Sequence, residues 1–253
     1  MSVKTIDTIV IGGGHAGLCM SFALQEDKRE HIVLEKKRIL EQWRSSRWDS
    51  FMMNTPIGYS RIMGQNDGLP ETEMSIPLAK SIKMWEECVK ERKFPVREQT
   101  EVISVEKDSE GHFLVNVQSE DGGPASYLAK NVIAAPGNYQ IPNIPTAAAN
   151  LEASVNQVRV GTYTNPDALV EGAVLVVGSG QTGIQLAEEL LKAGRKVFMA
   201  TSRVPGTIRS YRGEDVFFWL DRTGMLTMPK EALPDPNMKY DRIPFTGNNH
   251  SIS

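Results

Sequence analysis

The sequence predicts an α/β protein built from two similar halves, and three observations lead to this prediction. A run of apolar, β-branched residues near the N-terminus (TIVI) passes directly into the glycine cluster GGGHAG. A helical pattern follows the glycines, and a second short apolar strand follows the helix. The same order of strand, glycine turn, helix and strand returns about 165 residues later. Alternation of this kind is typical of a parallel sheet covered by helices.

In the first half the elements follow in order. A strand is predicted over Thr5 to Ile11, a helix from Ala16 to Glu26, and a second strand over His31 to Glu35. Parallel strands need a crossover helix, so these three elements form one βαβ unit. Residues 36–75 are rich in Trp, Met, Asn, Gly and Pro, and we expect a long irregular loop there. Loops of that length tend to carry function.

A helix and three strands are predicted for the rest of this half. Residues 77–93 have helical spacing, with Pro77 in the first turn, where its missing N–H does no harm. Residues 101–107 and 113–118 read as two strands joined by a turn, and residues 131–135 as a buried strand.

A proline-rich segment separates the halves. Residues 136–145 contain three prolines, which predicts a connector between two domains. The second half then has a strand over residues 173–177, a glycine turn over 178–183, a helix over 184–193 and a strand over 196–200.

Composition and charge argue against several classes of partner. The chain has 253 residues, 40% of them hydrophobic, which suits packed cores in one large or two smaller domains. With a net charge of −3 and no basic block, we expect no nucleic-acid partner. Cys19 and Cys88 form no CxxC pair, and no metal-ligand pattern is present. We find neither a signal peptide nor an apolar run of roughly 18 residues, so we expect a cytoplasmic protein with reduced thiols and no membrane partner.

The first glycine turn has the spacing of a dinucleotide-binding fingerprint. Gly12, Gly14 and Gly17 occupy the G-x-G-x-x-G positions, which allow a tight bend, close approach of a pyrophosphate, and close packing of helix on strand. The helix N-terminus, with His15 and Ala16, would bind the phosphate. Glu35 lies about 20 residues on, where a carboxylate accepts hydrogen bonds from an adenosine ribose. An ordinary turn and a solvated glutamate are the alternative reading.

The second glycine turn has the same spacing but a different neighbour at the ribose position. Gly178, Gly180 and Gly183 repeat the pattern, with three further residues of the turn expected at the cofactor: Ser179, Gln181 and Thr182. No acid follows the next strand, where Thr201, Ser202 and Arg203 stand instead. Hydroxyls and a guanidinium suit the 2′-phosphate of NADP. Arg203 as a solvated surface charge stays an alternative.

Two dinucleotide sites with different ribose partners imply electron transfer between two cofactors. The simplest pair is NADPH as the donor and FAD as the acceptor. Residues 1–150 would form the FAD-binding domain, to which residues 225–253 could return. Residues 165–224 would form an incomplete NADPH-binding domain.

The sequence resembles the two-dinucleotide-binding flavoproteins, and among them the branch similar to flavin-containing monooxygenases. Five segments carry the resemblance: IGGGHAG, EQWRSSRWDSFMMNTP, VIAAPGNYQIPNIP, VLVVGSGQTGIQLAEELLKAGRKV and YRGEDVFFWLDRTG. The resemblance implies two Rossmann-like domains with a three-layer arrangement. It also implies that NADPH reduces FAD, and that the reduced flavin forms a peroxide with dioxygen that oxygenates a small organic substrate.

The resemblance also implies roles for individual residues. Asn54 and Thr55 would lie at the isoalloxazine ring as catalytic residues, and Val102 would bind the adenine through its backbone. The remaining cofactor contacts that it implies are Lys36, Gln42, Trp43, Arg44, Trp48, Ala135 and Gly137. The two tryptophans could equally be core aromatics.

Three departures from the family pattern affect the expected activity. Pro136 removes a backbone donor near the cofactor, and Arg159 stands close to a position where relatives often carry histidine. Relatives continue past the C-terminus of this chain, so we expect a truncated protein, with a homodimer as one way to cover the flavin. A nucleotide- or flavin-binding protein without turnover is therefore the alternative function. A disulfide reductase ranks last because CxxC is absent.

Overall fold

A computed structural model describes residues 3–62, 65, 68, 76–120, 126–201 and 208–232. The chain divides into two compact units, one of residues 1–53 and 57–163 and the other of residues 54–56 and 164–253. Each unit contains a parallel pair of strands joined by a helix that follows a glycine turn.

The first unit begins with the predicted βαβ arrangement. Strand β1 (Val3–Ile11) leads into helix α1 (His15–Glu26), which returns to strand β2 (His31–Leu34). β1 and β2 pair in parallel over four residues of each strand. The carboxyl ends of the two strands therefore meet at one edge of the sheet, and the glycine turn begins at that edge.

Four more strands extend this sheet in the order β3-β2-β1-β6-β5-β4. The short β3 (Val96–Arg97) pairs with β2 in parallel, and β6 (Ser126–Ala134) pairs with β1 in parallel. β5 (Phe113–Ser119) and β4 (Thr100–Lys107) continue the sheet as antiparallel strands. The sheet is thus parallel around the glycine turn and antiparallel at one end.

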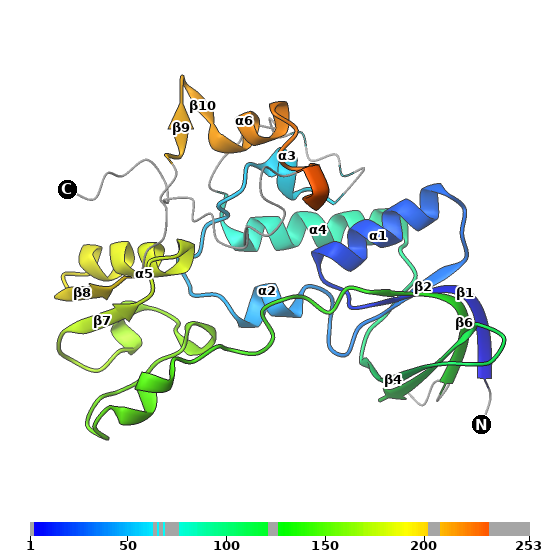
Figure 1. Ribbon diagram of the computed structural model, residues 1–253, viewed down its shortest axis with the longest axis horizontal. Coiled ribbons are helices and arrows are strands. Elements are labelled where there is room, and N and C mark those ends of the chain that lie inside the picture. Colours follow the sequence, from blue (N-terminus) through cyan, green and yellow to red (C-terminus); the bar gives the residue numbers. More distant parts are fainter. Residues whose placement is uncertain are drawn as a thin grey trace. The chain divides into compact units, whose positions relative to one another are not determined.

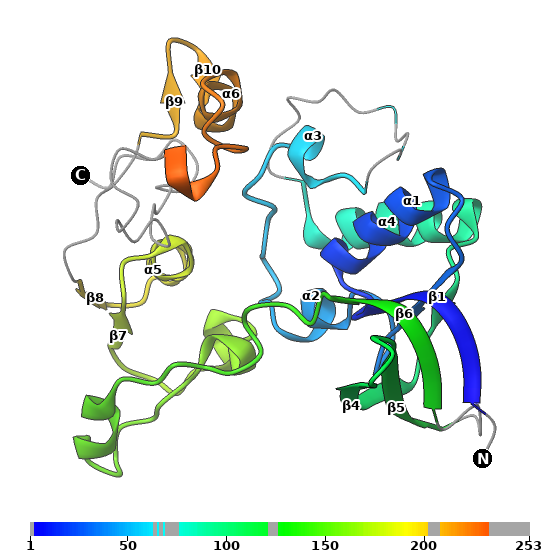
Figure 2. The ribbon, with the colours of Figure 1, turned by 45° about the vertical axis from the view of Figure 1, so that its right-hand side comes forward.

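The parallel strands of the first unit have buried side chains on both faces. Val10 packs against α1 through Leu24, whereas its neighbour Ile9 packs on the opposite face with Val115 and Val117 of β5. Successive side chains of a strand point to opposite faces, so one strand serves two cores. Helices α1 and α4 (Leu78–Arg92) lie side by side along the helical face, and both views show this (Figures 1 and 2).

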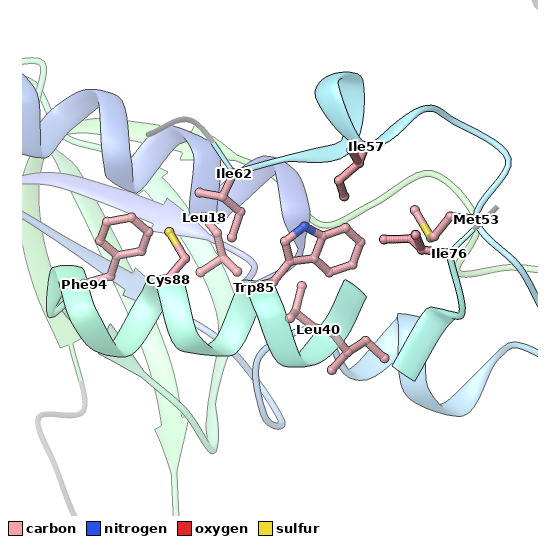
Figure 3. Close-up of a cluster of buried hydrophobic side chains, with 10 residues drawn as sticks. Leu18, Leu40, Met53, Ile57, Ile62, Ile76, Trp85, Cys88 and Phe94 are labelled. Carbon is pink, nitrogen blue, oxygen red and sulfur yellow. The ribbon is translucent and has the colours of Figure 1, made fainter. Parts of the chain in front are cut away.

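The largest core of the first unit surrounds Trp85, whose side chain is 1% exposed. Figure 3 shows the Trp85 ring projecting from α4 among Leu18, Leu40 and Ile57. The indole Nε1 donates a hydrogen bond of 2.9 Å to the carbonyl oxygen of Ser60. Trp85 therefore joins α4, α1 and the loop segment in one packed unit.

The segment over residues 36–75 differs from the expectation of an irregular loop. Its described residues include two short helices, α2 (Glu41–Ser45) and α3 (Ile57–Ser60). Neither is long enough to show a helical repeat in the sequence, and packing around Trp85 stabilises them instead. Strand β3 was also not predicted, because two residues at the edge of a sheet leave no periodic pattern.

The second unit repeats the strand, turn, helix and strand order. β7 (Val174–Val177) and β8 (Val197–Ala200) pair in parallel and are joined by α5 (Gln181–Lys192). A hairpin of β9 (Ser210–Tyr211) and β10 (Glu214–Asp215) leads into α6 (Val216–Arg222). The described residues also form four short 3-10 helices: Thr146–Asn150, Val160–Thr162, Pro166–Ala168 and Lys230–Ala232.

Within the described ranges, we find no helix with the length and apolar character that a membrane crossing requires.

Trp85→Ala is expected to lower the free energy of unfolding by about 3–5 kcal/mol, because it opens a cavity in the core and leaves the Ser60 carbonyl without its indole donor. Chemical denaturation followed by near-UV circular dichroism measures this loss. The control is Ile103→Ala, at a side chain that is 59% exposed, which should change stability by less than about 0.5 kcal/mol. Equal effects of the two substitutions would contradict the packing described here.

Candidate functional site

The first glycine turn brings the end of β1, the start of α1 and the end of β6 into close contact. Gly12 has φ +108°, and a Cβ there would lie 2.3 Å from the carbonyl oxygen of Ala135. A Cβ on Gly17 would lie 1.9 Å from the carbonyl oxygen of Gly12. Neither position has room for a side chain. At Gly14, by contrast, a Cβ would meet no described atom within 4 Å, so space is open above the helix N-terminus.

The second glycine turn has nearly the same geometry. Gly178 has φ +107°, and a Cβ on Gly183 would lie 2.0 Å from the carbonyl oxygen of Gly178. Gly12 N–H donates to Leu34 O at 2.8 Å, and Gly178 N–H donates to the equivalent Ala200 O at 2.9 Å.

Both helices also begin at a glycine N-cap in extended conformation, Gly14 for α1 and Gly180 for α5. A glycine cap has no side chain to accept from the first backbone N–H groups of its helix. Each turn therefore presents helix donors to an incoming anion. The other predicted members of the two turns follow the caps or lie between the glycines: His15, Ala16, Ser179, Gln181 and Thr182.

Glu35 lies directly against the first glycine turn. Its Oε2 accepts a hydrogen bond of 2.7 Å from Gly13 N–H, and its Oε1 accepts one of 2.9 Å from Lys37 N–H. Two backbone donors thus hold the carboxylate in one orientation. Because a carboxylate has about four acceptor positions, further hydroxyl donors can still bind it.

A polar cleft opens beside Glu35. The backbone N–H of Thr100 donates to Glu35 O at 2.9 Å, which brings the start of β4 next to β2. Val102 follows two residues later, where the pairing of β4 with β5 shifts register. The cleft is lined by Lys36, Lys37, Arg38, Glu41, Gln99, Glu101 and Glu120. The structure thus brings Glu35, Lys36 and Val102 into one region of the first unit.

The second unit has a different side chain at the position equivalent to Glu35. The carbonyl oxygen of Ala200 accepts from Gly178 N–H as that of Leu34 accepts from Gly12 N–H. Ala200 is therefore equivalent to Leu34, and the next residue, Thr201, is equivalent to Glu35. Thr201 is exposed. Ser202 and Arg203, which the sequence analysis placed at this cofactor, lie outside the described residues.

His15 links the first turn to the core. Its Nε2 is 2.8 Å from Ser60 O, so Nε2 carries the proton and Nδ1 faces Cys19 Sγ at 3.8 Å. Burial acts to lower the pKa of His15, but the contacts with Cys19 and the Ser60 carbonyl outweigh it and raise the pKa. The imidazole also meets the Trp85 ring edge-on at 5.2 Å.

The residues that the resemblance assigns to the flavin end form helix α2 and the residues after it. Trp43 lies 5.5 Å from the Trp85 ring, and Trp48 is 5% exposed. Arg44 forms an ion pair with Glu86 of α4, and Gln42 Nε2 donates to Ser46 Oγ at 2.7 Å. These contacts show packing of α2 on α4, the alternative that was left open for the two tryptophans. A role toward a flavin stays a prediction.

Asn54 contacts helix α5 within the second unit. Its Oδ1 accepts a hydrogen bond of 2.6 Å from Gln185 Nε2, across 131 residues of sequence. Sequence reasoning missed Gln185. One sequence signal could have pointed to Gln185: it lies one helical turn after Gln181. The next two residues of the helix, Leu186 and Ala187, are buried.

The linker after β6 adopts a tight bend. Ala135 N–H donates to Ile11 O at 2.8 Å, and Gly137 follows with φ +84°. Gln140 Nε2 donates to Pro136 O at 2.7 Å, which closes the bend. Ala135 is thus brought against Gly12, whereas Arg159 is an exposed residue further along the first unit.

The model of the family "Pyridine nucleotide-disulphide oxidoreductase" matches residues 9–220. The chain belongs to this family. The matched span contains both glycine turns of this pyridine nucleotide-disulphide oxidoreductase family member, together with Glu35 and Asn54. Among the described residues, no group of three or more His, Cys, Asp or Glu side chains could hold a metal ion.

Two relatives of this family member indicate its place among oxidoreductases. It is 33% identical over 228 residues to the uncharacterized oxidoreductase CzcO of Bacillus velezensis, covering 87% of this chain and 62% of that protein. It is 28% identical over 255 residues to human flavin-containing monooxygenase 2, covering 91% of this chain and 46% of the human protein. The chain therefore spans less than two thirds of the length of either relative.

Solved structures of oxidoreductases share the fold of this chain. The flavin-containing monooxygenase from Stenotrophomonas maltophilia superposes with a TM-score of 0.74 at 21% identity, covering 87% of this chain and 64% of that one. The bacillithiol disulfide reductase from Bacillus cereus superposes with a TM-score of 0.65 at 22% identity, covering 87% of this chain and 66% of that one. OTEMO in complex with FAD and NADP superposes with a TM-score of 0.61 at 16% identity, covering 81% of this chain and 40% of that one. Because oxygenating and disulfide-reducing proteins superpose alike, the fold alone does not select the reaction.

Alanine substitutions are expected to separate the structural glycines of the first turn from the exposed one. Gly17→Ala should lower the free energy of unfolding by about 1–3 kcal/mol, because its Cβ would overlap a backbone oxygen that cannot move aside. Gly14→Ala should change it by less than about 1 kcal/mol, since its backbone angles suit alanine and its surroundings are open. Thermal denaturation of both variants tests this. A larger loss at Gly14 than at Gly17 would contradict the geometry.

Proposed function

We propose that this chain is an FAD- and NADPH-dependent oxidoreductase of the monooxygenase type. Hydride would pass from NADPH to the flavin, and the electrons would then pass to dioxygen with a small organic molecule as the substrate. FAD would bind in the first unit, within residues 1–150, and NADPH in the second, within residues 165–224. The observation that carries the proposal is the repetition of one turn geometry with different side chains at the ribose position.

The first turn fits a dinucleotide diphosphate and an adenosine. The open space at Gly14 lets a phosphate reach the N–H groups at the start of α1, whereas a side chain there would project into that space. Glu35 is already held at the turn by Gly13 N–H, so its free acceptor positions can take the ribose hydroxyls. The polar cleft next to Glu35 would receive the adenine, with Lys36 and the backbone of Val102 at its sides. FAD bound there would supply the electron acceptor for hydride transfer.

The second turn also fits a nucleotide, but the protein supplies no carboxylate side chain at the ribose position. Gly180 offers the same open approach to α5 as Gly14 offers to α1. Thr201 supplies a hydroxyl where Glu35 supplies a negative charge, so a 2′-phosphate meets no like charge at this residue. We assign the 2′-phosphate to Thr201, Ser202 and Arg203, the sequence feature that favours NADPH over NADH.

The contact between Asn54 and Gln185 supports a donor role for Asn54. Because Gln185 Nε2 donates to the side-chain oxygen of Asn54, the Asn54 amide is oriented with its NH₂ group left to donate. A donor held in one orientation can position a carbonyl or a reduced oxygen species without paying for its own ordering. We propose this role for Asn54, with Thr55 beside it.

Cysteine chemistry favours oxygenation over disulfide reduction. Neither Cys19 nor Cys88 forms a disulfide in the described part of the chain, and neither belongs to a CxxC pair. Cys88 is 4% exposed, and burial raises the pKa of its thiol, which opposes formation of the reactive thiolate. Without a CxxC pair the chain has no redox dithiol, so we place disulfide reduction behind oxygenation.

The purified protein is expected to be yellow and to bleach when NADPH is added without oxygen. Glu35→Ala should lose most of the bound flavin, because it removes the acceptor at the ribose and the partner of Gly13 N–H. Visible spectra and mass identification of the released cofactor measure both effects, and Glu30→Ala, at an exposed side chain, is the control. A colourless protein that binds neither nucleotide would overturn the proposal. A yellow protein that NADPH fails to bleach would instead support nucleotide binding without turnover.

Arg203→Ala is expected to raise the KM for NADPH about tenfold or more while changing that for NADH little, because only NADPH carries the 2′-phosphate. Steady-state flavin reduction with each nucleotide gives the two values. Lys192→Ala, at the opposite end of α5 from the glycine turn, should change neither. If Arg203→Ala weakens both nucleotides equally, the 2′-phosphate assignment is wrong.

A further inference from the structure

Arg47 is a half-buried cation whose guanidinium lies on aromatic rings of the first unit. The guanidinium carbon is 5.0 Å from the centroid of the Trp43 ring and 5.4 Å from that of Phe51. Trp48 meets Phe51 edge-on at 4.9 Å, so the supporting rings are themselves packed together. Cation–π contacts of this kind contribute about 0.5–2 kcal/mol each. The resemblance implies roles for Trp43, Arg44 and Trp48 but none for Arg47.

The charge of Arg47 is not balanced within the first unit. No acidic side chain in the described part of the chain forms an ion pair with it, and its Nη1 donates a hydrogen bond of 2.9 Å to the carbonyl oxygen of Ser46. Two other arginines that lie on rings have carboxylates, whereas Arg212 and Arg222, which lie on Tyr211 and Phe218, are exposed and form no ion pair in the described part of the chain. Arg92 lies over Phe22 and pairs with Glu26, and Arg209 lies over Phe217 and pairs with Asp215.

This arrangement makes a bound anion favourable. Burial lowers the pKa of Arg47, whereas the nearby Tyr139 acts in the opposite direction. Because an arginine side chain stays protonated in proteins, the cost of its partial desolvation is not relieved by losing the proton. A guanidinium has five N–H donors, and the bond to Ser46 uses one. An oxyanion would both satisfy the donors and balance the charge.

The side chains around Arg47 suit a ligand that joins a carboxylate to an apolar or aromatic group. The Trp43 and Phe51 ring centroids are 6.5 Å apart, so both rings lie on one side of the guanidinium carbon. The donors on its other side remain for a planar group that accepts two parallel hydrogen bonds. Tyr139, which acts to raise the pKa of Arg47, is 82% exposed. Phe51 offers an apolar surface.

A dinucleotide phosphate is the other source of an oxyanion, and its place is elsewhere. The phosphate-binding donors are those at the start of α1, next to His15. From His15 the ring contacts lead to Trp85 and then to Trp43 before they reach Arg47. The guanidinium is thus supported by a different part of the core from the one that forms the glycine turn.

We propose that Arg47 forms an anion-binding subsite, supported by the Trp43 and Phe51 rings, that binds the carboxylate of a small organic acid. The proposed binding of a carboxylate depends only on Arg47 and the rings that contact it. That the bound acid is the substrate rests on the proposed function, so the test measures binding and flavin content separately from turnover.

The test compares three probes of similar size by isothermal titration calorimetry: benzoate, neutral benzamide and phenyl phosphate. Benzoate should bind and benzamide should not. Arg47→Gln should weaken benzoate binding about tenfold or more, since it removes a charge-assisted pair. Arg159→Gln, at an exposed arginine of the same unit, is the matched control and should bind benzoate normally. The flavin content of Arg47→Gln should equal that of the unsubstituted protein.

Protection from phenylglyoxal provides a measurement that requires no variant. Benzoate should slow modification of Arg47 but not of Arg159, as read from peptide masses. Absence of benzoate binding, equal binding by Arg47→Gln, or no protection of Arg47 would each overturn the proposal. So would loss of flavin from Arg47→Gln, or a preference for phenyl phosphate over benzoate, because the guanidinium would then serve a phosphate. Benzoate binding in a protein that shows no flavin reduction would support the subsite while defeating the proposed function.

Discussion

The close approach of a helix to the preceding strand end is the constraint on which both halves of the chain depend. In each half the last glycine of the turn lies so near the carbonyl oxygen of the first that a Cβ would come within 1.9 Å or 2.0 Å of it. That approach fixes where α1 starts relative to β1, and where α5 starts relative to β7. The direction of the helix donors, and with it the position of any bound phosphate, follows from this contact.

The first unit surrounds its turn with support that the described part of the second unit does not repeat. Ala135 closes over Gly12 and Glu35 closes over Gly13, whereas a Cβ on Gly178 would meet no described atom within 4 Å. The parallel strands of the first unit are buried on both faces, but in β7 and β8 the side chains of Leu175, Val177 and Phe198 are more than half exposed. The same local motif therefore stands in two different surroundings.

Local patterns predicted the turns and the long elements, but contacts between distant segments could not be predicted. Glycine spacing and apolar periodicity gave β1, α1, β2 and α5 to within a few residues, because those signals are local. Helix α2 depends on packing against Trp85, and the bond from Gln185 to Asn54 crosses 131 residues, so neither leaves a local signal. Arg47 was overlooked because an arginine between two tryptophans in sequence does not reveal which rings it will lie on.

The two backbone bonds that hold Glu35 have a consequence for recognition. A glutamate free in solvent must lose rotamer entropy when it captures a ligand, and that loss subtracts from affinity. Here Gly13 N–H and Lys37 N–H have already fixed the side chain before any ligand arrives. Glu35 is preorganised, and the loss of rotamer entropy was incurred once, when the chain folded.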